Sequence, residues 1–175
     1  EKIKHFVSKD ALNIDGLGKK VIEKFWDLGY IKFPSHIFNL DYLNIEKLDG
    51  WGKKSVNNLK SSIEKSKNIN LDKFIFSLGI RHIGQENAKI LAQFFISKKK
   101  FLGLTKNFNY NLINNIDGIG DTQISSLKKF FLNKINIQKV LRLSEIMNVN
   151  SILVDKKAKL KNQTFMFTGK LSGIS

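Results

Sequence analysis

Hydrophobic residues recur along most of this chain at the three- and four-residue spacing of an amphipathic helix. The spacing is clearest in four segments that each follow a short glycine-containing stretch. Their apolar positions are Val21, Ile22, Phe25 and Trp26; Val56, Leu59 and Ile63; Ala88, Leu91, Ala92 and Phe95; and Ile124, Leu127 and Phe131. A last helix is expected over 137–147, with Val140, Leu141, Ile146 and Met147 facing inward. The pattern predicts an all-α domain.

The four glycine-containing stretches are variants of one pattern. They read Ile14-Asp15-Gly16-Leu17-Gly18, Leu48-Asp49-Gly50-Trp51-Gly52, Arg81-His82-Ile83-Gly84 and Ile116-Asp117-Gly118-Ile119-Gly120, and their last glycines recur at intervals of 34, 32 and 36 residues. Shorter apolar segments precede them at 8–13, 41–48, 72–78 and 111–116, with Ser8, Asp41 and Asp72 as candidate N-caps. The sequence therefore predicts four helix–turn–helix units that bury their apolar faces on one another.

A turn of this kind is suited to binding phosphate. Glycine permits a positive φ and leaves no side chain in the way, while the start of the next helix offers unpaired N–H groups and a positive dipole end. The apolar residue between the glycines is expected to anchor each turn in the core. The predicted DNA-binding residues are Gly16, Gly18, Lys19, Lys20, Gly50, Gly52, Lys53, Lys54, Ser55, Arg81, His82, Gly84, Gly118, Gly120 and Thr122.

Two of the turns depart from the pattern. His82 replaces the first glycine of the third turn, which requires either another backbone geometry or strain of about 1 kcal/mol. Arg81 and His82 are candidates to reach a phosphate or a minor groove, or else simply to cap the turn. In the fourth turn Asp121 stands where the first two turns have lysine, so we expect the lowest phosphate affinity there. At least one of the four turns is expected to be purely structural.

The charge of the chain supports a polyanionic partner. The formal net charge is +15 over 175 residues, and nearly all the cations are lysines because Arg81 and Arg142 are the only arginines. Lysine is a flexible point charge, which suits sequence-independent contact with phosphates. A coding bias toward lysine explains the excess equally well, but not its position beside the turns. No apolar run approaches the length of a membrane span, and no membrane partner is expected.

No catalytic or metal-binding residue is predicted. The chain lacks cysteine, and its three histidines have no second ligand at metal spacing. The stretch Lys47-Leu48-Asp49-Gly50 matches the pattern around a nucleophilic lysine, but the Asp-Gly pair recurs in two other turns, so the repeat already explains it. Trp26 and Trp51 are expected in the core, and 98–100 is expected to be a solvated helix face.

The amino-acid composition of the chain changes near its end. A charged stretch at 155–161 precedes 164–169 (TFMFTG), which has the composition of a strand and cannot be stable alone. We therefore expect a helical domain over 1–149, a linker over 150–161 and the truncated start of a second domain over 162–175. The first residue is not Met, so the chain is expected to be a piece of a longer protein.

The whole chain resembles the C-terminal region of bacterial NAD+-dependent DNA ligases. The resemblance is carried by Lys4-His5-Phe6-Val7-Ser8 with the first turn, by 74–84 (FIFSLGIRHIG), and by 165–172 (FMFTGKLS). It implies four helix–hairpin–helix motifs in two pairs forming one compact domain, followed by a linker and the opening strand of an α/β BRCT domain.

The resemblance also implies a function. The parent enzyme would adenylate its own lysine from NAD+, pass AMP to the 5′-phosphate of a nick and seal it with Mg2+, in replication and repair. The adenylation, OB and zinc-finger domains are expected upstream, so this region would hold no cofactor and be inactive alone. It would grip nicked double-stranded DNA across the minor groove, as a monomer in the bacterial cytoplasm near the nucleoid. If about six phosphates are neutralised, log K falls with log salt at a slope near −5.

Two other interpretations remain open. One is a helix–hairpin–helix DNA-binding or scaffold module of another repair protein such as a nuclease; a scaffold would bind a protein partner tightly and DNA poorly. The chain also has a superficial DNA glycosylase pattern, in which Lys53 follows a turn and Asp72 lies 20 residues after Gly52. Four turns in series argue against a glycosylase, which needs one hairpin beside a base pocket.

Overall fold

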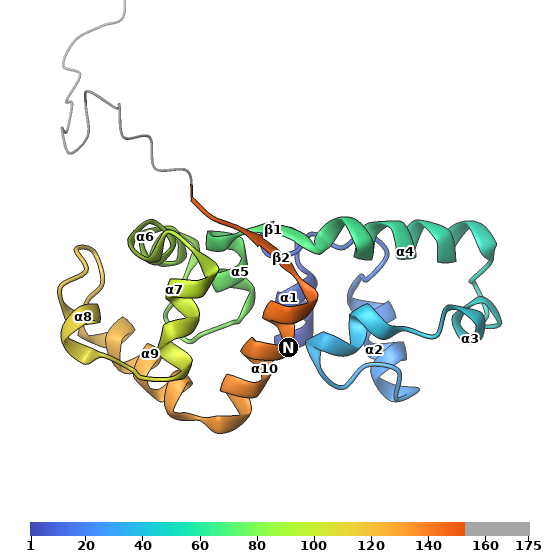
Figure 1. Ribbon diagram of the computed structural model, residues 1–175. Helices are drawn as coiled ribbons and strands as arrows, with labels where there is room; N and C mark the ends of the chain where they lie inside the picture. The colour runs from blue at the N-terminus through green and yellow to red at the C-terminus, as the bar shows by residue number, and fades with distance from the viewer. Residues whose placement is uncertain (153–175) are drawn as a thin grey trace, which may run out of the picture.

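The computed structural model describes residues 1–152, and the predicted strand at 164–169 and most of the predicted linker lie outside this part. Helices dominate it (Figure 1). They are α1 (Lys2–Val7), α2 (Lys19–Asp27), α3 (Tyr42–Glu46), α4 (Lys53–Ser66), α5 (Leu71–Ser77), α6 (Gln85–Phe95), α7 (Lys98–Leu102), α8 (Tyr110–Asn114), α9 (Asp121–Leu132) and α10 (Lys134–Ile146), with 3-10 helices η1 (Pro34–Asn39) and η2 (Gly103–Thr105). The predicted helices after the four turns are confirmed as α2, α4, α6 and α9.

The prediction for the shorter leading helices was partly wrong. Asp41 does cap α3, because its Oδ1 accepts hydrogen bonds from the N–H groups of Leu43 and Asn44, both at 3.1 Å. Ser8 instead ends α1, and 8–13 forms turns rather than a helix. Asp72 lies within the first turn of α5, whose N-cap is Asn70. The first unit therefore begins with α1, earlier than the periodicity indicated.

A small parallel sheet corrects the prediction of an all-α domain. Strand β1 (Asn68–Asn70) follows α4 and pairs in parallel with β2 (Asn148–Asn150), which follows α10. The side chain of Asn148 donates from Nδ2 to Oδ1 of Asn68 at 2.8 Å. Each strand has only three residues and its partner lies 80 residues away, so no local pattern marked either one. The described part is mostly helical, with this sheet joining its two halves.

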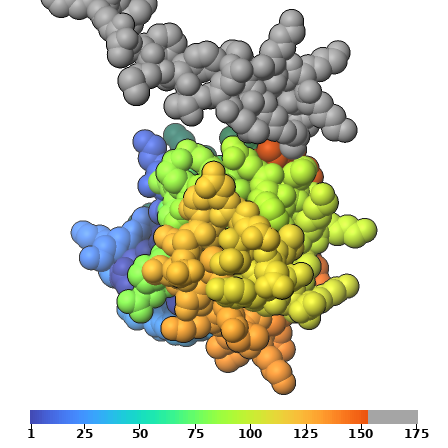
Figure 2. Space-filling view, turned by 90° about the vertical axis from the view of Figure 1, so that its left-hand side faces the viewer, coloured from blue at the N-terminus to red at the C-terminus, as the bar shows by residue number. Residues whose placement is uncertain are grey.

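The core is aromatic at its centre. Phe6, Phe25, Phe74 and Phe101 are among its largest fully buried side chains. Phe101 contacts Phe131 edge-to-face at 5.6 Å between ring centroids. Figure 2 shows the face of the molecule on which α8, α9 and α10 lie. The second half of the chain therefore packs around its own aromatic cluster.

Two predicted core residues are not buried. Trp26 is 45% exposed and Leu141 is 39% exposed, whereas Trp51 is half-buried with its ring 5.5 Å from that of Phe25. Helix α10 begins at Lys134 and turns Val140 and Leu143 inward, which leaves Leu141 on a different face. Helical periodicity identified α2 and α10 correctly but misplaced the edges of their buried stripes.

The first two units pack against each other through their turns. A Cβ on Gly16 would lie 3.4 Å from the side chain of Leu59 in α4, and the N–H of Asp15 donates to Ser62 Oγ of the same helix at 2.8 Å. In return, Lys24 of α2 donates from Nζ to the carbonyl of Asp49 at 3.2 Å. Each turn therefore rests on the helix that follows the other turn.

The fourth turn makes the equivalent contact with α6. A Cβ on Gly118 would lie 2.8 Å from Cδ1 of Ile90. In Figure 1, α2, α3 and α4 lie on one side of the small sheet, and α6 to α9 lie on the other. The turn-to-helix contacts thus occur within each half of the domain.

The lysine run at 98–100 is only partly the solvated face that we predicted. Lys98 is half-buried, and its Nζ donates to the carbonyls of Ser144 at 2.8 Å and Met147 at 3.3 Å. These carbonyls lie at the C-terminal end of α10, where a cation is favoured by the helix dipole. Lys99 and Lys100 are exposed, as predicted.

We expect Lys98→Ala to lower the free energy of unfolding by about 1–2 kcal/mol, because two carbonyl acceptors lose a charged donor. The matched control Lys99→Ala removes an exposed lysine from the same run and should stay within about 0.5 kcal/mol of the parent. Urea denaturation followed by circular dichroism measures both. Equal stability of the two variants would show that the Lys98 contact contributes nothing.

Candidate nucleic-acid interface

The four turns have the same backbone geometry. The first glycine of each turn, or His82 in its place, has a positive φ: +91° at Gly16, +81° at Gly50, +61° at His82 and +80° at Gly118. The next residue is apolar, and its N–H donates to the carbonyl three residues earlier, at distances between 2.9 and 3.4 Å. Leu17, Ile83 and Ile119 are buried and Trp51 is half-buried, which confirms that these residues anchor the turns in the core.

His82 adopts the strained conformation rather than a different turn. Its φ lies in the left-handed region, where a non-glycine residue is disfavoured by roughly 1 kcal/mol. The side chain of Asn87 donates from Nδ2 to the His82 carbonyl at 3.0 Å and so supports this geometry. The third turn therefore carries two exposed polar side chains, Arg81 and His82, in a position where the other turns have an aspartate and a glycine.

The second glycine of each turn has no structural need to be glycine. Gly18, Gly52, Gly84 and Gly120 are the N-caps of α2, α4, α6 and α9, and none has a positive φ. A Cβ would meet nothing within 4 Å at the first three, and only Gln123 Oε1 at 3.4 Å at the fourth. Since neither backbone nor packing excludes a side chain, what glycine provides here is open space over the helix start.

Within the described part of the chain, the first N–H groups of three of these helices have no side-chain cap. In residues 1–152, no side chain caps α2, α6 or α9, so their first N–H groups face the space above the glycines. At α4 the Ser55 hydroxyl accepts from the Gly52 N–H at 3.0 Å and donates to the Gly52 carbonyl at 2.9 Å. Ser55 is half-buried, whereas every other predicted contact residue is exposed. Its hydroxyl proton is thus already used to hold the turn.

The charges at the helix starts divide the turns into two classes. Lys19 and Lys20 begin α2, and Lys53 and Lys54 begin α4, with no acidic residue in either first turn. The first turns of the other two helices contain an acid: Glu86 in α6 and Asp121 in α9. Glu86 accepts a hydrogen bond from Lys89 at 2.7 Å, and this bond raises the pKa of Lys89. The positive potential is therefore concentrated at the first two turns.

Two residues that hold the turns in place had no signal in the turn pattern. Ser62 accepts the hydrogen bond of the Asp15 N–H, and Lys24 reaches the carbonyl of Asp49. Both act across the interface between the first two units, so only knowledge of the helix pairing could have identified them.

The glycosylase pattern does not correspond to a site. Lys53 begins α4, while Asp72 lies beyond its other end, and a helix of 14 residues is about 21 Å long. Lys47 is exposed, with Nζ 3.5 Å from Asn44 Oδ1, so it has no enclosing nucleotide pocket. Within the described residues, no three His, Cys, Asp or Glu side chains are grouped to hold a metal, and none of their helices could cross a membrane.

Comparison with known proteins gives two findings. A family described as "Helix-hairpin-helix motif" matches residues 73–140, which include the third and fourth turns. A DNA ligase of Pelagibacter ubique is 55% identical over 176 residues, which cover all of this chain and 26% of that protein. DNA ligases of Rickettsia bellii and Rickettsia rickettsii are each 43% identical over 188 residues, again with the whole chain covered.

The chain belongs to the bacterial DNA ligase family. It contains a helix–hairpin–helix motif, and it spans about a quarter of the length of these relatives.

The turn geometry predicts that a serine destabilises the domain at the first glycine of a turn but not at the second. Gly50→Ser places a side chain at φ +81° and should cost about 1–2 kcal/mol of stability. Gly52→Ser is the matched control, because its N-cap position has an ordinary φ and open space, and serine is a favourable N-cap there. Thermal unfolding of both variants tests this, and a comparable loss of stability for Gly52→Ser would contradict the assignment of open space.

Proposed function

We propose that this chain is the sequence-independent duplex-binding part of an NAD+-dependent DNA ligase, and that it grips the DNA backbone around a nick. The observation that carries the proposal is the repeated open helix start: four N-cap glycines whose missing side chains leave space over bare N–H groups. A phosphate in that space would accept from the backbone N–H groups and neutralise the positive dipole end.

The chemistry of the surface favours contact with phosphates over reading of bases. Backbone N–H groups and lysines recognise phosphate oxygens and carry no direct sequence information. Base reading in the major groove commonly uses the bidentate fork of arginine, and the chain has only Arg81 and Arg142. We therefore expect one affinity for many duplex sequences.

We infer that the four turns act as four helix–hairpin–helix motifs in two pairs and contribute unequally. The first two turns combine open helix starts with paired lysines, so they would supply most of the binding energy. The third would depend on Arg81 and His82, because Glu86 lowers the potential at the start of α6. The fourth, with Asp121, would contribute least through charge, leaving Gly118, Gly120 and Thr122 as its contacts.

The chemistry of nick sealing is assigned to the rest of the polypeptide. The chain has no cysteine, and its described residues form no metal cluster, so they do not fit the zinc or magnesium that the resemblance implies. We propose that the adenylation, OB and zinc-finger domains precede this region, and that NAD+ reacts there. The isolated chain would then bind DNA as a monomer without joining it, and the whole enzyme would act in the bacterial cytoplasm.

A helix–hairpin–helix scaffold from another repair protein is the second candidate. It would need the same turns for architecture but would bind a protein instead of DNA. The matched relatives are DNA ligases over the full length of this chain, which supports the first proposal.

Substitution of two lysines tests the proposal directly. We expect Lys53→Glu/Lys54→Glu to weaken duplex binding roughly tenfold or more. The slope of log K against log salt concentration should become shallower by about 2 from a value near −5, because two phosphate contacts are lost. Fluorescence anisotropy with nicked, intact and single-stranded DNA across a salt series measures both quantities.

The matched control is Lys99→Glu/Lys100→Glu, which makes the same charge change at exposed positions of α7. It should leave the salt slope within about 0.5 of the parent, because these lysines belong to none of the four turns. If the parent shows no salt-sensitive duplex binding at low ionic strength, the turns are architectural and the proposal is wrong.

A further inference from the structure

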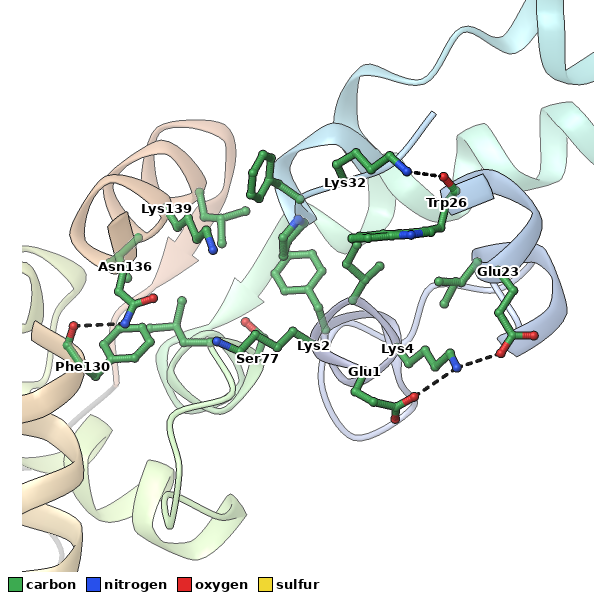
Figure 3. A pocket seen from close by; sticks show the side chains of 18 of the residues that line it. Glu1, Lys2, Lys4, Glu23, Trp26, Lys32, Ser77, Phe130, Asn136 and Lys139 are labelled. Carbon is green, nitrogen blue, oxygen red and sulfur yellow. Dashed lines mark hydrogen bonds and ion pairs between the residues drawn. The ribbon is translucent and has the colours of Figure 1, made fainter. Parts of the chain in front are cut away.

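A cleft of about 640 Å³ separates the first helical unit from the last helix. Helices α1 and α2 and the start of η1 form one wall, while α10 and the end of α9 form the other (Figure 3). The end of α5 lies between them, through Ser77 and Leu78. The cleft therefore lies where the two halves of the domain meet, and none of the predicted DNA-binding residues lines it.

The lining is mainly apolar and includes two aromatic rings that the domain leaves half-exposed. Trp26 is 45% exposed and Phe33 is 46% exposed. Lys32 Nζ lies 4.5 Å from the centroid of the Trp26 ring, and Lys139 Nζ lies 5.1 Å from that of Phe33. Apolar area of this kind gains about 25 cal/mol per Å² when covered, so a partner with apolar side chains would bind favourably.

The N-terminal end of the chain forms part of the same cleft. Glu1 and Lys2 line it, and α1 begins at Lys2. Lys4 Nζ fixes this end to α2, because it lies 3.1 Å from Glu1 Oε1 and 2.8 Å from Glu23 Oε1. The related ligases are about four times as long as this chain. If the other domains precede Glu1, as we propose above, their polypeptide enters this domain at a residue that lines the same cleft as Trp26 and Phe33.

We propose that the segment immediately preceding Glu1 in the full-length protein docks into this cleft and covers Trp26 and Phe33 with apolar side chains. The proposal rests on the proposed function only in placing further polypeptide before Glu1. Among the described lining residues, Lys4 is paired with Glu1 and Glu23, and Lys32 Nζ donates to the Trp26 carbonyl at 2.6 Å, which leaves Lys2 and Lys139 against one acid, Asp27. The docked segment therefore carries at least one acidic side chain to face these lysines.

Docking at this position has a mechanical consequence. A segment that lies in the cleft contacts both halves of the domain at once, beside the contact that Lys139 of α10 already makes with the ring of Phe33. The upstream part of the enzyme thereby adds to the contacts that fix the first two turns relative to the third and fourth, through lining residues outside the predicted DNA-binding set.

Photocrosslinking in the full-length protein tests the docking. Benzoylphenylalanine replaces Phe33, and the crosslinked peptides are identified by mass spectrometry after irradiation. We expect an intramolecular crosslink to the residues just before Glu1. The control places the same group at Leu43, an apolar residue of α3 that is 76% exposed and remote from the cleft, and it should give no such crosslink.

A second measurement does not depend on the bulky probe. Phe33→Ser should speed proteolysis just before Glu1 in the full-length protein about threefold or more, since local opening exposes a docked segment. Leu43→Ser should leave that rate unchanged. The proposal is overturned if crosslinks from position 33 reach only residues 1–152, residues beyond 152 or a second molecule, or if none form.

The DNA-binding variant separates this inference from the proposed function. Lys53→Glu/Lys54→Glu lies outside the cleft and should keep the crosslink while losing DNA affinity. Loss of DNA binding with an intact crosslink would leave the docking in place, whereas normal DNA binding without the crosslink would refute the docking alone.

Discussion

The structure depends on one constraint, which is met four times: a turn must bury its apolar residue while it leaves the next helix start uncovered. A positive φ at Gly16, Gly50, His82 or Gly118 makes this possible, because it reverses the chain tightly enough to point the following side chain into the core. The N-cap glycine then keeps the N–H groups accessible. Packing and the proposed phosphate binding are thus carried by neighbouring residues of each turn, so one can change without the other.

The turns would not hold their positions without the contacts between units. The first turn rests on α4 through Leu59 and Ser62, and the second is contacted by Lys24 of α2, so each unit supports its neighbour. Gly118 rests in the same way on Ile90 of α6. Between the halves, the β1–β2 pairing provides a long-range connection, and within the second half Lys98 joins α7 to the end of α10. A helical domain built from short units gains its rigidity from such contacts.

Many of the helices and the shared turn pattern could be predicted from the sequence, because they depend on residues that are close together along the chain. The helices after the turns follow from apolar spacing, the anchoring role of Leu17 and Ile119 follows from the glycines on either side, and that of Ile83 follows from its equivalent position before Gly84. The leading helix of the first unit was misplaced because Ser8 resembles an N-cap but ends α1. Trp26 was expected in the core, yet it forms part of one wall of a cleft, and the opposite wall comes from α10, which is distant in sequence.

The sequence by itself determined the repeated turns, the positions of their glycines, the excess of lysine beside the first two and the family to which the chain belongs. These properties depend on residue type and on neighbours within a few positions. Only the tertiary structure decided which turn rests on which helix, that Lys98 is structural, that two three-residue strands pair, and that Trp26 and Phe33 remain half-exposed beside the N-terminal end. Each of these features depends on contacts between residues that are far apart along the chain. Hydrophobic burial establishes such contacts only when all the helices pack together.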